Sequence, residues 1–119
     1  MPSTAYASYG ILAAVSATFA VLAEPTRRRL LDELLAGERS VGELVERTGL
    51  PQPTVSKHLR TMRDAGVVTA RVDGPVRWYR LEPDGLSEVD RWLAPYRRLW
   101  AERLDALERH LARDEEERR

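Results

Sequence analysis

The chain has 119 residues, and its 19 Lys and Arg residues balance its 19 Asp and Glu residues, so the formal net charge is zero. It contains no cysteine, which excludes disulfides, thiolate metal sites and thiol-based redox sensors. This length is enough for one domain with a hydrophobic core. We expect that domain over residues 11–112, between a flexible N-terminal arm, 1–10, and a charged C-terminal tail, 113–119.

The distribution of charge along the chain is more informative than its sum. Between Gln52 and Arg80 there are six cations and two acids, whereas from Leu81 onward there are eight cations and eleven acids. A basic middle beside an acidic end indicates a polyanionic partner.

The first predicted helix, Ile11–Ala23, is apolar nearly all round. A helix without a polar face has to be covered on several sides, and in so small a chain a second copy is the natural cover. Its apolar run of about 14 residues is short of the roughly 20 that span a membrane. No Lys or Arg precedes Arg27, so the basic start of a signal peptide is missing. A buried helix is therefore favoured over a targeting segment.

The second predicted helix runs from Pro25 to about Ala36, and Gly37 ends it. Four leucines are expected to face inward: Leu30, Leu31, Leu34 and Leu35. Residues 27–29 are all arginine and lie in the first turn, where the helix dipole disfavours cations. Two interpretations carry equal weight: partial pairing with Glu24 and Asp32, or contact of an arginine with a DNA phosphate.

Two short helices follow. Ser40 and Glu43 form a capping box at the start of the first, which ends at Thr48–Gly49. The second, Leu50–Gly66, has an apolar stripe of Val55, Leu59 and Met62. Between these positions lie donors and cations that suit phosphates and base edges: Gln52, Thr54, Ser56, Lys57, Arg60 and Arg63. Two short helices joined by a glycine-containing turn are typical of a helix-turn-helix.

Two β-branched and aromatic runs, Val67–Val72 and Val76–Leu81, predict a β-hairpin. Pro75 in the connection leaves open whether the turn is a minimal two-residue one. Arg71 and Arg77 flank the tip. A basic hairpin directly after a helix-turn-helix indicates a winged helix, with the hairpin as the wing along the DNA backbone.

The last predicted helix begins at Ser87 and has an apolar seam at steps of three and four: Leu86, Val89, Leu93, Tyr96, Trp100, Leu104, Leu107 and Leu111. The seam is too long to be buried by one small domain, which favours helix pairing between two protomers. Pro95 is expected to kink or split the helix, and the end beyond Arg113 is expected to fray.

The chain closely resembles ArsR-type bacterial winged-helix regulators from about residue 11 to 111. The segments that carry the resemblance are Ala23–Leu31, Ser40–Leu44, Gln52–Leu59 and Ala65–Val68. Trp92–Trp100 is similar to a branch of that family without metal ligands. Pro51 departs from the family pattern, in which a serine or similar cap is common, so the start of the fourth helix is left open.

The resemblance implies a mainly α (α+β) fold, a winged helix-turn-helix with about five helices and a two-stranded wing. It also implies a homodimer, built by the first and last helices, on double-stranded DNA of approximate two-fold symmetry. The implied DNA-binding residues are Gln52, Thr54, Ser56 and Lys57 in the major groove, Arg60 near the phosphates, and Arg71 and Arg77 on the wing. The predicted dimer residues are Ile11, Val15, Phe19, Leu93, Tyr96, Trp100, Leu104 and Leu107.

The chain lacks the metal ligands of many relatives, and its histidines are His58 and His110. His110 with Asp114 would supply half a site at most, so we expect no metal and no cofactor. An unknown organic effector is an alternative, with Trp92, Tyr96 and Trp100 lining a pocket, although aromatic residues at helical spacing more often form a core.

The sequence therefore predicts a cytoplasmic, non-enzymatic transcriptional regulator, a repressor rather than an activator, with no membrane partner. No nucleophile motif or phosphate-binding loop indicates catalysis. The competing hypothesis is a winged helix that serves as a protein-interaction module, with its basic face merely solvated. Salt-dependent DNA binding separates the two.

Overall fold

The computed structural model describes residues 17–119 of the chain. The predicted arm, Ile11 and Val15 lie outside these residues. The chain divides into two compact units, Met1–Val89 and Asp90–Arg119. We describe each unit by itself, and the single domain expected over residues 11–112 stays a prediction.

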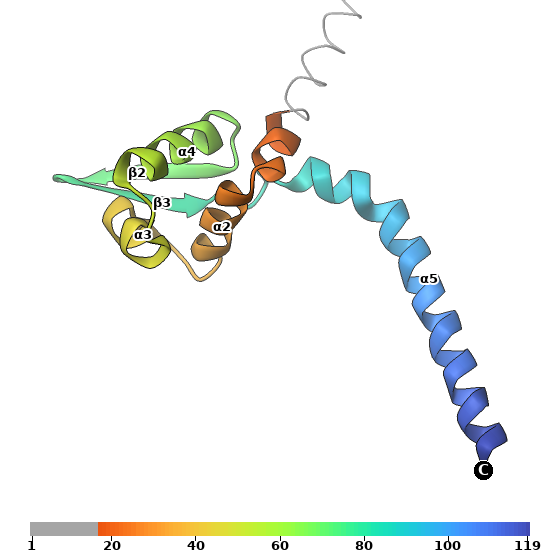
Figure 1. The fold of residues 1–119 in the computed structure, drawn as a ribbon. Helices are drawn as coiled ribbons and strands as arrows, with labels where there is room; N and C mark the ends of the chain where they lie inside the picture. Colours follow the sequence, from red (N-terminus) through yellow and green to blue (C-terminus); the bar gives the residue numbers. More distant parts are fainter. Residues whose placement is uncertain (1–16) are drawn as a thin grey trace, which may run out of the picture. The chain divides into compact units, whose positions relative to one another are not determined.

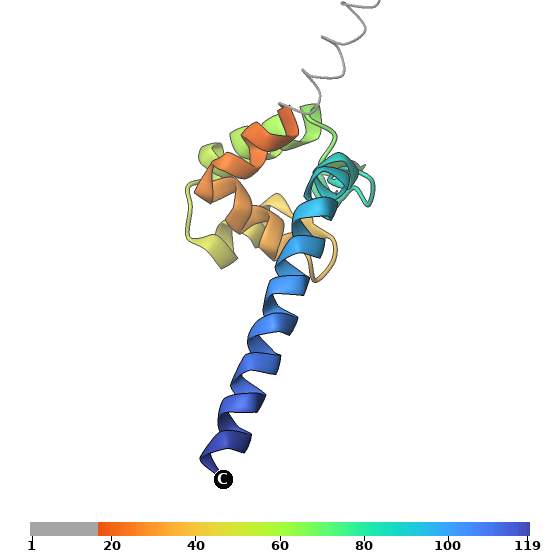
Figure 2. The ribbon, with the colours of Figure 1, turned by 90° about the vertical axis from the view of Figure 1, so that its right-hand side faces the viewer.

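Short helices with well-defined ends make up most of the first unit (Figures 1 and 2). Residues 17–23 are helical, and α2 (Pro25–Leu34), α3 (Val41–Thr48) and α4 (Gln52–Asp64) follow. The Ser40 half of the predicted capping box is confirmed, because the Ser40 hydroxyl accepts the Glu43 backbone N–H at 3.1 Å. The Glu43 carboxylate accepts the Ser40 hydroxyl at 3.4 Å in place of the Ser40 backbone N–H. Gly49 then ends α3 in the left-handed conformation, at φ 72°.

The end of α4 is closed by Gly66, as predicted. Its φ of 76° turns the chain out of the helix. The N–H of Gly66 donates to the Arg63 carbonyl, and the N–H of Val67 donates to the Met62 carbonyl, both at 3.0 Å. This pair of bonds satisfies two carbonyls that a helix end otherwise leaves without donors. The sharp turn brings the chain directly into the sheet.

The sheet is antiparallel and has the strand order β1-β3-β2. β2 (Val68–Asp73) and β3 (Val76–Leu81) form the predicted hairpin, with Asp73 opposite Val76. The connection is therefore a two-residue turn, which Gly74 permits at φ 60°. β1 (Arg39–Ser40) pairs with β3 and was not predicted, because two residues are too few to show an alternating pattern.

The core of the first unit lies between the helices and one face of the sheet. Leu30, Leu31 and Leu34 are buried, as predicted, together with the whole stripe of α4. The prediction for Leu35 was wrong, because its side chain is 73% exposed. Leu35 follows the last residue of α2 and lies about 100° around the helix from Leu34.

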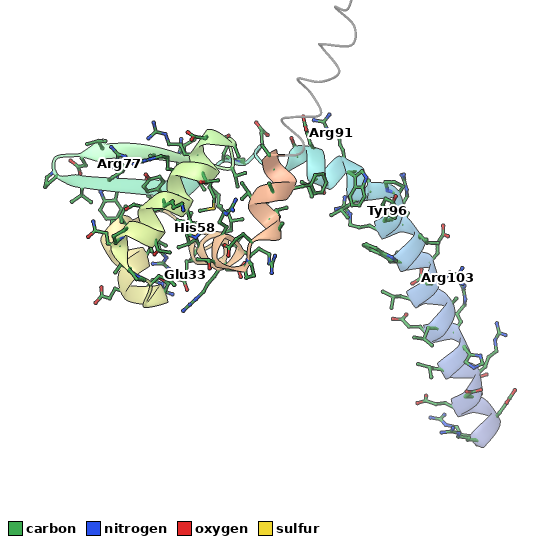
Figure 3. All side chains as sticks on the ribbon, turned by 45° about the horizontal axis from the view of Figure 1, so that its top comes forward. Glu33, His58, Arg77, Arg91, Tyr96 and Arg103 are labelled. Carbon is green, nitrogen blue, oxygen red and sulfur yellow. The ribbon has the colours of Figure 1, made fainter. Side chains whose placement is uncertain are left out.

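The helix α5 (Ser87–Arg118) runs through Pro95 without a break. Pro95 therefore does not split it, and the end that was expected to fray is helical. None of its side chains is buried within the chain. Figure 3 shows its side chains, with Tyr96 and Arg103 labelled. No helix within residues 17–119 is both long and apolar enough to cross a membrane.

The first unit thus has the arrangement of a winged helix-turn-helix: α3 and α4 form the helix-turn-helix, and β2–β3 forms the wing. Within residues 17–119 there are five helical segments and one three-stranded sheet. The predicted fold class is confirmed, with β1 as an additional strand.

Candidate nucleic-acid interface

One flank of α4 faces a hollow beside the wing. Val55, Leu59 and Met62 are fully buried and fix the rotation of the helix. Steps of four, four and three residues then place a set of polar side chains on the wing side of the helix: Gln52, Ser56, Arg60 and Arg63. These four side chains, together with Arg77 of β3, line a hollow of about 520 Å³. Two separate elements therefore present their donors to one surface.

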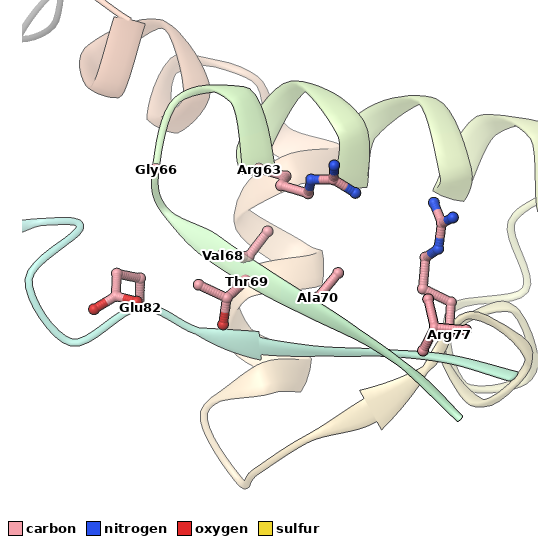
Figure 4. Close-up of a pocket in the computed structure, with 8 residues that line it drawn as sticks. Arg63, Gly66, Val68, Thr69, Ala70, Arg77 and Glu82 are labelled. Atoms are coloured by element: carbon pink, nitrogen blue, oxygen red, sulfur yellow. The ribbon is translucent and has the colours of Figure 1, made fainter. Parts of the chain in front are cut away.

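The strand register places Arg77 on this surface. Arg77 lies opposite Val72 in the hairpin, and successive side chains of a strand point to opposite faces. Arg77 therefore lies on the same face as Tyr79, which is buried in the core. Figure 4 shows the side chains of Arg63 and Arg77 on the α4 side of the hairpin, where both also line a second hollow of about 480 Å³.

The first hollow has a positive charge that the whole chain lacks. Three of its lining residues are arginines, Arg60, Arg63 and Arg77, and one is an acid, Asp64. All three arginines are exposed. Over the part of the chain that the structure describes, none of these guanidinium groups forms an ion pair. Unpaired guanidinium groups on a concave surface are suited to phosphate oxygens.

Arg71, the other predicted wing residue, is placed differently. One edge of its guanidinium contacts the Glu38 carboxylate: Nε lies 3.0 and 3.1 Å from the two oxygens, and one terminal nitrogen lies 2.6 Å from Oε1. This contact lowers the pKa of Glu38 below its ordinary value. Arg71 lies opposite Trp78, on the other face of the hairpin from Arg77. The structure therefore does not bring the two predicted wing residues together.

The other predicted reading residues are also divided among different sides of α4. Lys57 is exposed and points away from the buried stripe, whereas Thr54 is half-buried. Because each helical residue turns by about 100°, Thr54 lies on the opposite flank from Gln52 and Ser56. The predicted set also omitted Arg63, which lines both hollows. Its signal in the sequence is its spacing of three from Arg60 and seven from Ser56.

The position at which α4 begins, which the sequence left open, is Pro51. It is the N-cap residue of α4 and supplies no side-chain cap.

The arginines in the first turn of α2 contact the helical segment before it. The guanidinium groups of Arg27 and Arg28 donate to the carbonyls of Ala20 and Leu22, at 3.4 and 2.6 Å. Glu24 accepts the backbone N–H of Arg27 at 2.9 Å rather than its guanidinium. Of the two interpretations, pairing of Arg27 and Arg28 with Glu24 and Asp32 is therefore replaced by contacts with the preceding helical segment, and contact with a DNA phosphate stays a prediction.

The histidines occupy two unlike environments. His58 is half-buried on α4. On α5, Nε2 of His110 lies 3.7 Å from Oδ2 of Asp114, as their spacing of four residues predicted. Among residues 17–119 the structure shows no cluster of three or more side chains that could hold a metal ion.

The aromatic face of α5 is uncovered within one chain. The Trp92 and Tyr96 rings lie 4.9 Å apart, and the Tyr96 and Trp100 rings lie 6.3 Å apart. Both tryptophans are 53% exposed, so these rings are not part of a core within one chain, and a core shared between two protomers stays a prediction. Leu104 and Leu107 continue the exposed face. Leu93 of α5 and Phe19 of the first helical segment are half-buried. Burial within one chain does not show what a second copy would contact, so the predicted dimer residues remain predictions.

Comparison with known proteins identifies the relatives of this chain. Residues 24–70 match the family model described as "Bacterial regulatory protein, arsR family". The chain is 52% identical over 56 residues to a probable mercury resistance operon repressor of Streptomyces lividans, covering 47% of this chain and 45% of that protein. It is 33% identical over 75 residues to the arsenical resistance operon repressor of Staphylococcus aureus, covering 63% of this chain and 72% of that protein.

Among solved structures, the chain is similar to the homodimeric winged helix-turn-helix DNA-binding domain of a possible ArsR-family regulator from Mycobacterium bovis. The identity is 30%, the TM-score is 0.62, and the match covers 82% of this chain and 87% of that chain. The chain thus spans less than half of the Streptomyces lividans relative but most of this domain. The family model, the arsenical resistance repressor of which this chain covers 72%, and the shared fold all indicate the same family. The chain therefore belongs to the ArsR family of bacterial regulatory proteins.

Proposed function

We propose that the protein is a homodimeric transcriptional repressor, which binds a pseudo-palindromic operator with α4 in the major groove. The observation that carries this proposal is the hollow in which Arg60 and Arg63 of α4 meet Arg77 of the wing. Gln52, Ser56 and Lys57 are the residues that read base edges in this proposal. The relatives are named as repressors or regulators, so repression by occupying the operator is preferred to enzymatic activity, and the cytoplasm is where such a protein meets DNA.

In this proposal α4 reads the DNA sequence and the wing contacts the DNA backbone, and measurements of DNA binding can separate these two roles. Operator fragments would first be selected from a random DNA pool, and their affinity would then be measured as a function of salt. Lys57→Ala should weaken selected DNA more than random DNA, because base contacts carry the specificity. Arg77→Ala should weaken binding to both DNAs equally and make the salt slope shallower by about one unit per protomer, which is about two units for a dimer. Arg109→Ala, on exposed α5, is the matched control and should change neither.

Two results would contradict the proposal. Binding without any preference between selected and random DNA at physiological salt would rule out operator recognition. Affinity that does not fall with salt would favour the protein-interaction module instead, because its basic face would then contact no phosphates.

The proposed dimer rests on the exposed seam of α5. Val89, Leu93, Tyr96 and Trp100 are spaced by four, three and four residues, and the same spacing repeats from Trp100 through Leu104 and Leu107 to Leu111. An 11-residue repeat has 3.67 residues per turn, close to the natural value, so the apolar stripe runs almost straight along the helix. Leu104 is 60% exposed within one chain, and a second copy is the cover that we propose.

Light scattering after size-exclusion chromatography tests the dimer. Leu107→Glu should convert dimer to monomer, because each two-fold dimer would bury two of the new carboxylates without partners. Arg109→Glu adds the same side chain about 200° around the helix and should leave the dimer intact. A monomeric parent protein at micromolar concentration would refute this part of the proposal.

A further inference from the structure

The outer face of the wing holds an arginine that the DNA-facing hollow does not use. Arg71 is 55% exposed, yet the edge of its guanidinium group formed by Nε and one terminal nitrogen is engaged by the Glu38 carboxylate. The same guanidinium lies 5.6 Å from the centre of the Trp78 ring and 3.9 Å from the Asp73 carboxylate. Of the three wing arginines, Arg71 therefore has three partners, Arg80 donates its Nε–H to the Thr69 hydroxyl at 3.0 Å, and Arg77 forms no ion pair within residues 17–119.

The strand β1 gives Glu38 its position. Glu38 directly precedes β1, and Arg39 and Ser40 of β1 pair with Tyr79 and Trp78 of β3. Arg39 is held in turn by the carbonyl of Glu33, which accepts its Nε–H at 2.8 Å. The carboxylate thus belongs to an ordered edge of the sheet and reaches across to the side chain of Arg71 on β2.

We infer that Glu38 withholds Arg71 from DNA and so removes one potential phosphate contact of the wing from each protomer. This inference rests on the proposed function. A guanidinium group binds phosphate best through two parallel N–H donors, and Glu38 already occupies such a pair. An intramolecular carboxylate at this distance has a high local concentration compared with a DNA phosphate. Glu38 is therefore a positioning residue that sets how strongly the wing binds DNA of any sequence.

The experiment is a double-mutant cycle in DNA binding, with Glu38→Gln, Arg71→Gln and the double variant, each measured against selected and random DNA over a range of salt. Arg71→Gln alone should leave affinity and salt slope unchanged. Glu38→Gln should raise affinity by up to about fivefold per protomer, the usual upper limit for an exposed ion pair. It should steepen the slope of the dimer by about two units, because each protomer releases one Arg71. The gain should be equal on both DNAs, because phosphate contacts carry no sequence information.

The double variant separates release of Arg71 from simple removal of a negative charge. If Glu38 acts through Arg71, the double variant should behave as Arg71→Gln does. A gain from Glu38→Gln that persists without Arg71 would overturn the inference, as would a loss of affinity and slope from Arg71→Gln alone. No gain from Glu38→Gln would also overturn it. Each result leaves the parent protein's operator binding intact, so failure of the inference is distinct from failure of the proposed function.

Discussion

Gly85 should be the least replaceable glycine of the first unit for a purely steric reason. It lies in the connection between β3 and α5, where the Glu82 N–H donates to the Val67 carbonyl at 2.9 Å. This bond presses the connection against the turn after α4. A Cβ atom at Gly85 would lie 2.7 Å from the Gly66 carbonyl oxygen and 2.9 Å from Val67 Cα. Both neighbours are backbone atoms, so neither can move aside as a side chain tip can.

Gly85→Ala should therefore lower the free energy of unfolding by about 1–3 kcal/mol, as overpacking does in other cores. Each kcal/mol corresponds to about 4–8 °C in Tm for a domain of this size. Thermal and urea unfolding followed by circular dichroism would measure the loss. Gly42→Ala in α3 is the matched control, since its Cβ would meet only the Ser40 hydroxyl at 3.8 Å. It should gain about 0.5–1 kcal/mol of helix stability. Equal stability of Gly85→Ala and the parent protein would refute the reasoning.

Four further substitutions test other parts of the fold by urea unfolding. Leu59→Ala, at a fully buried position, should cost about 2–5 kcal/mol, whereas Leu35→Ala should stay within about 0.5 kcal/mol; similar losses would contradict the assigned burial. Ser40→Ala should cost about 1 kcal/mol through loss of the cap on α3. The hydrogen bond from Arg47 lowers the pKa of Glu33, so its ionised form contributes stability that is lost as pH falls below the ordinary glutamate value of about 4.3. Glu33→Gln should therefore flatten the acid side of the pH–stability curve, and an unchanged curve would exclude this contribution.

Local patterns predicted most of the fold because its elements have local causes. The capping box at Ser40, the left-handed Gly66 and the stripe Val55–Met62 each depend on residues within one or two helical turns. The hairpin was predictable for the same reason, although Pro75 left its turn open until the register placed Asp73 opposite Val76. β1 was missed because its pairing with β3 depends on residues far away in the sequence.

The candidate interface was less predictable, because charge alone does not say which cations are free. Arg71 and Arg77 look equivalent in the sequence, one on each side of the tip. The strand register separates them onto opposite faces, and Glu38, which lies 33 residues before Arg71, neutralises only one of them. Arg63 was overlooked as a site residue for a related reason. Its spacing places it on the same side of α4 as Arg60 and Ser56, but only the structure shows that this side shares a hollow with the wing.

The zero net charge of the chain has a consequence for how it should bind DNA. Long-range attraction scales with net charge, so little of it is available, and affinity must come from cations at the surface of contact. Four exposed cations of the first unit are candidates in each protomer: Lys57, Arg60, Arg63 and Arg77. If all four cations of each protomer displace counterions, a dimer releases counterions from about eight phosphates, which gives a salt slope of about −7. If Arg71 also contacts phosphate, the slope approaches about −9. A parent slope steeper than about −7 that returns to about −7 in Arg71→Gln would therefore show that Glu38 does not withhold Arg71.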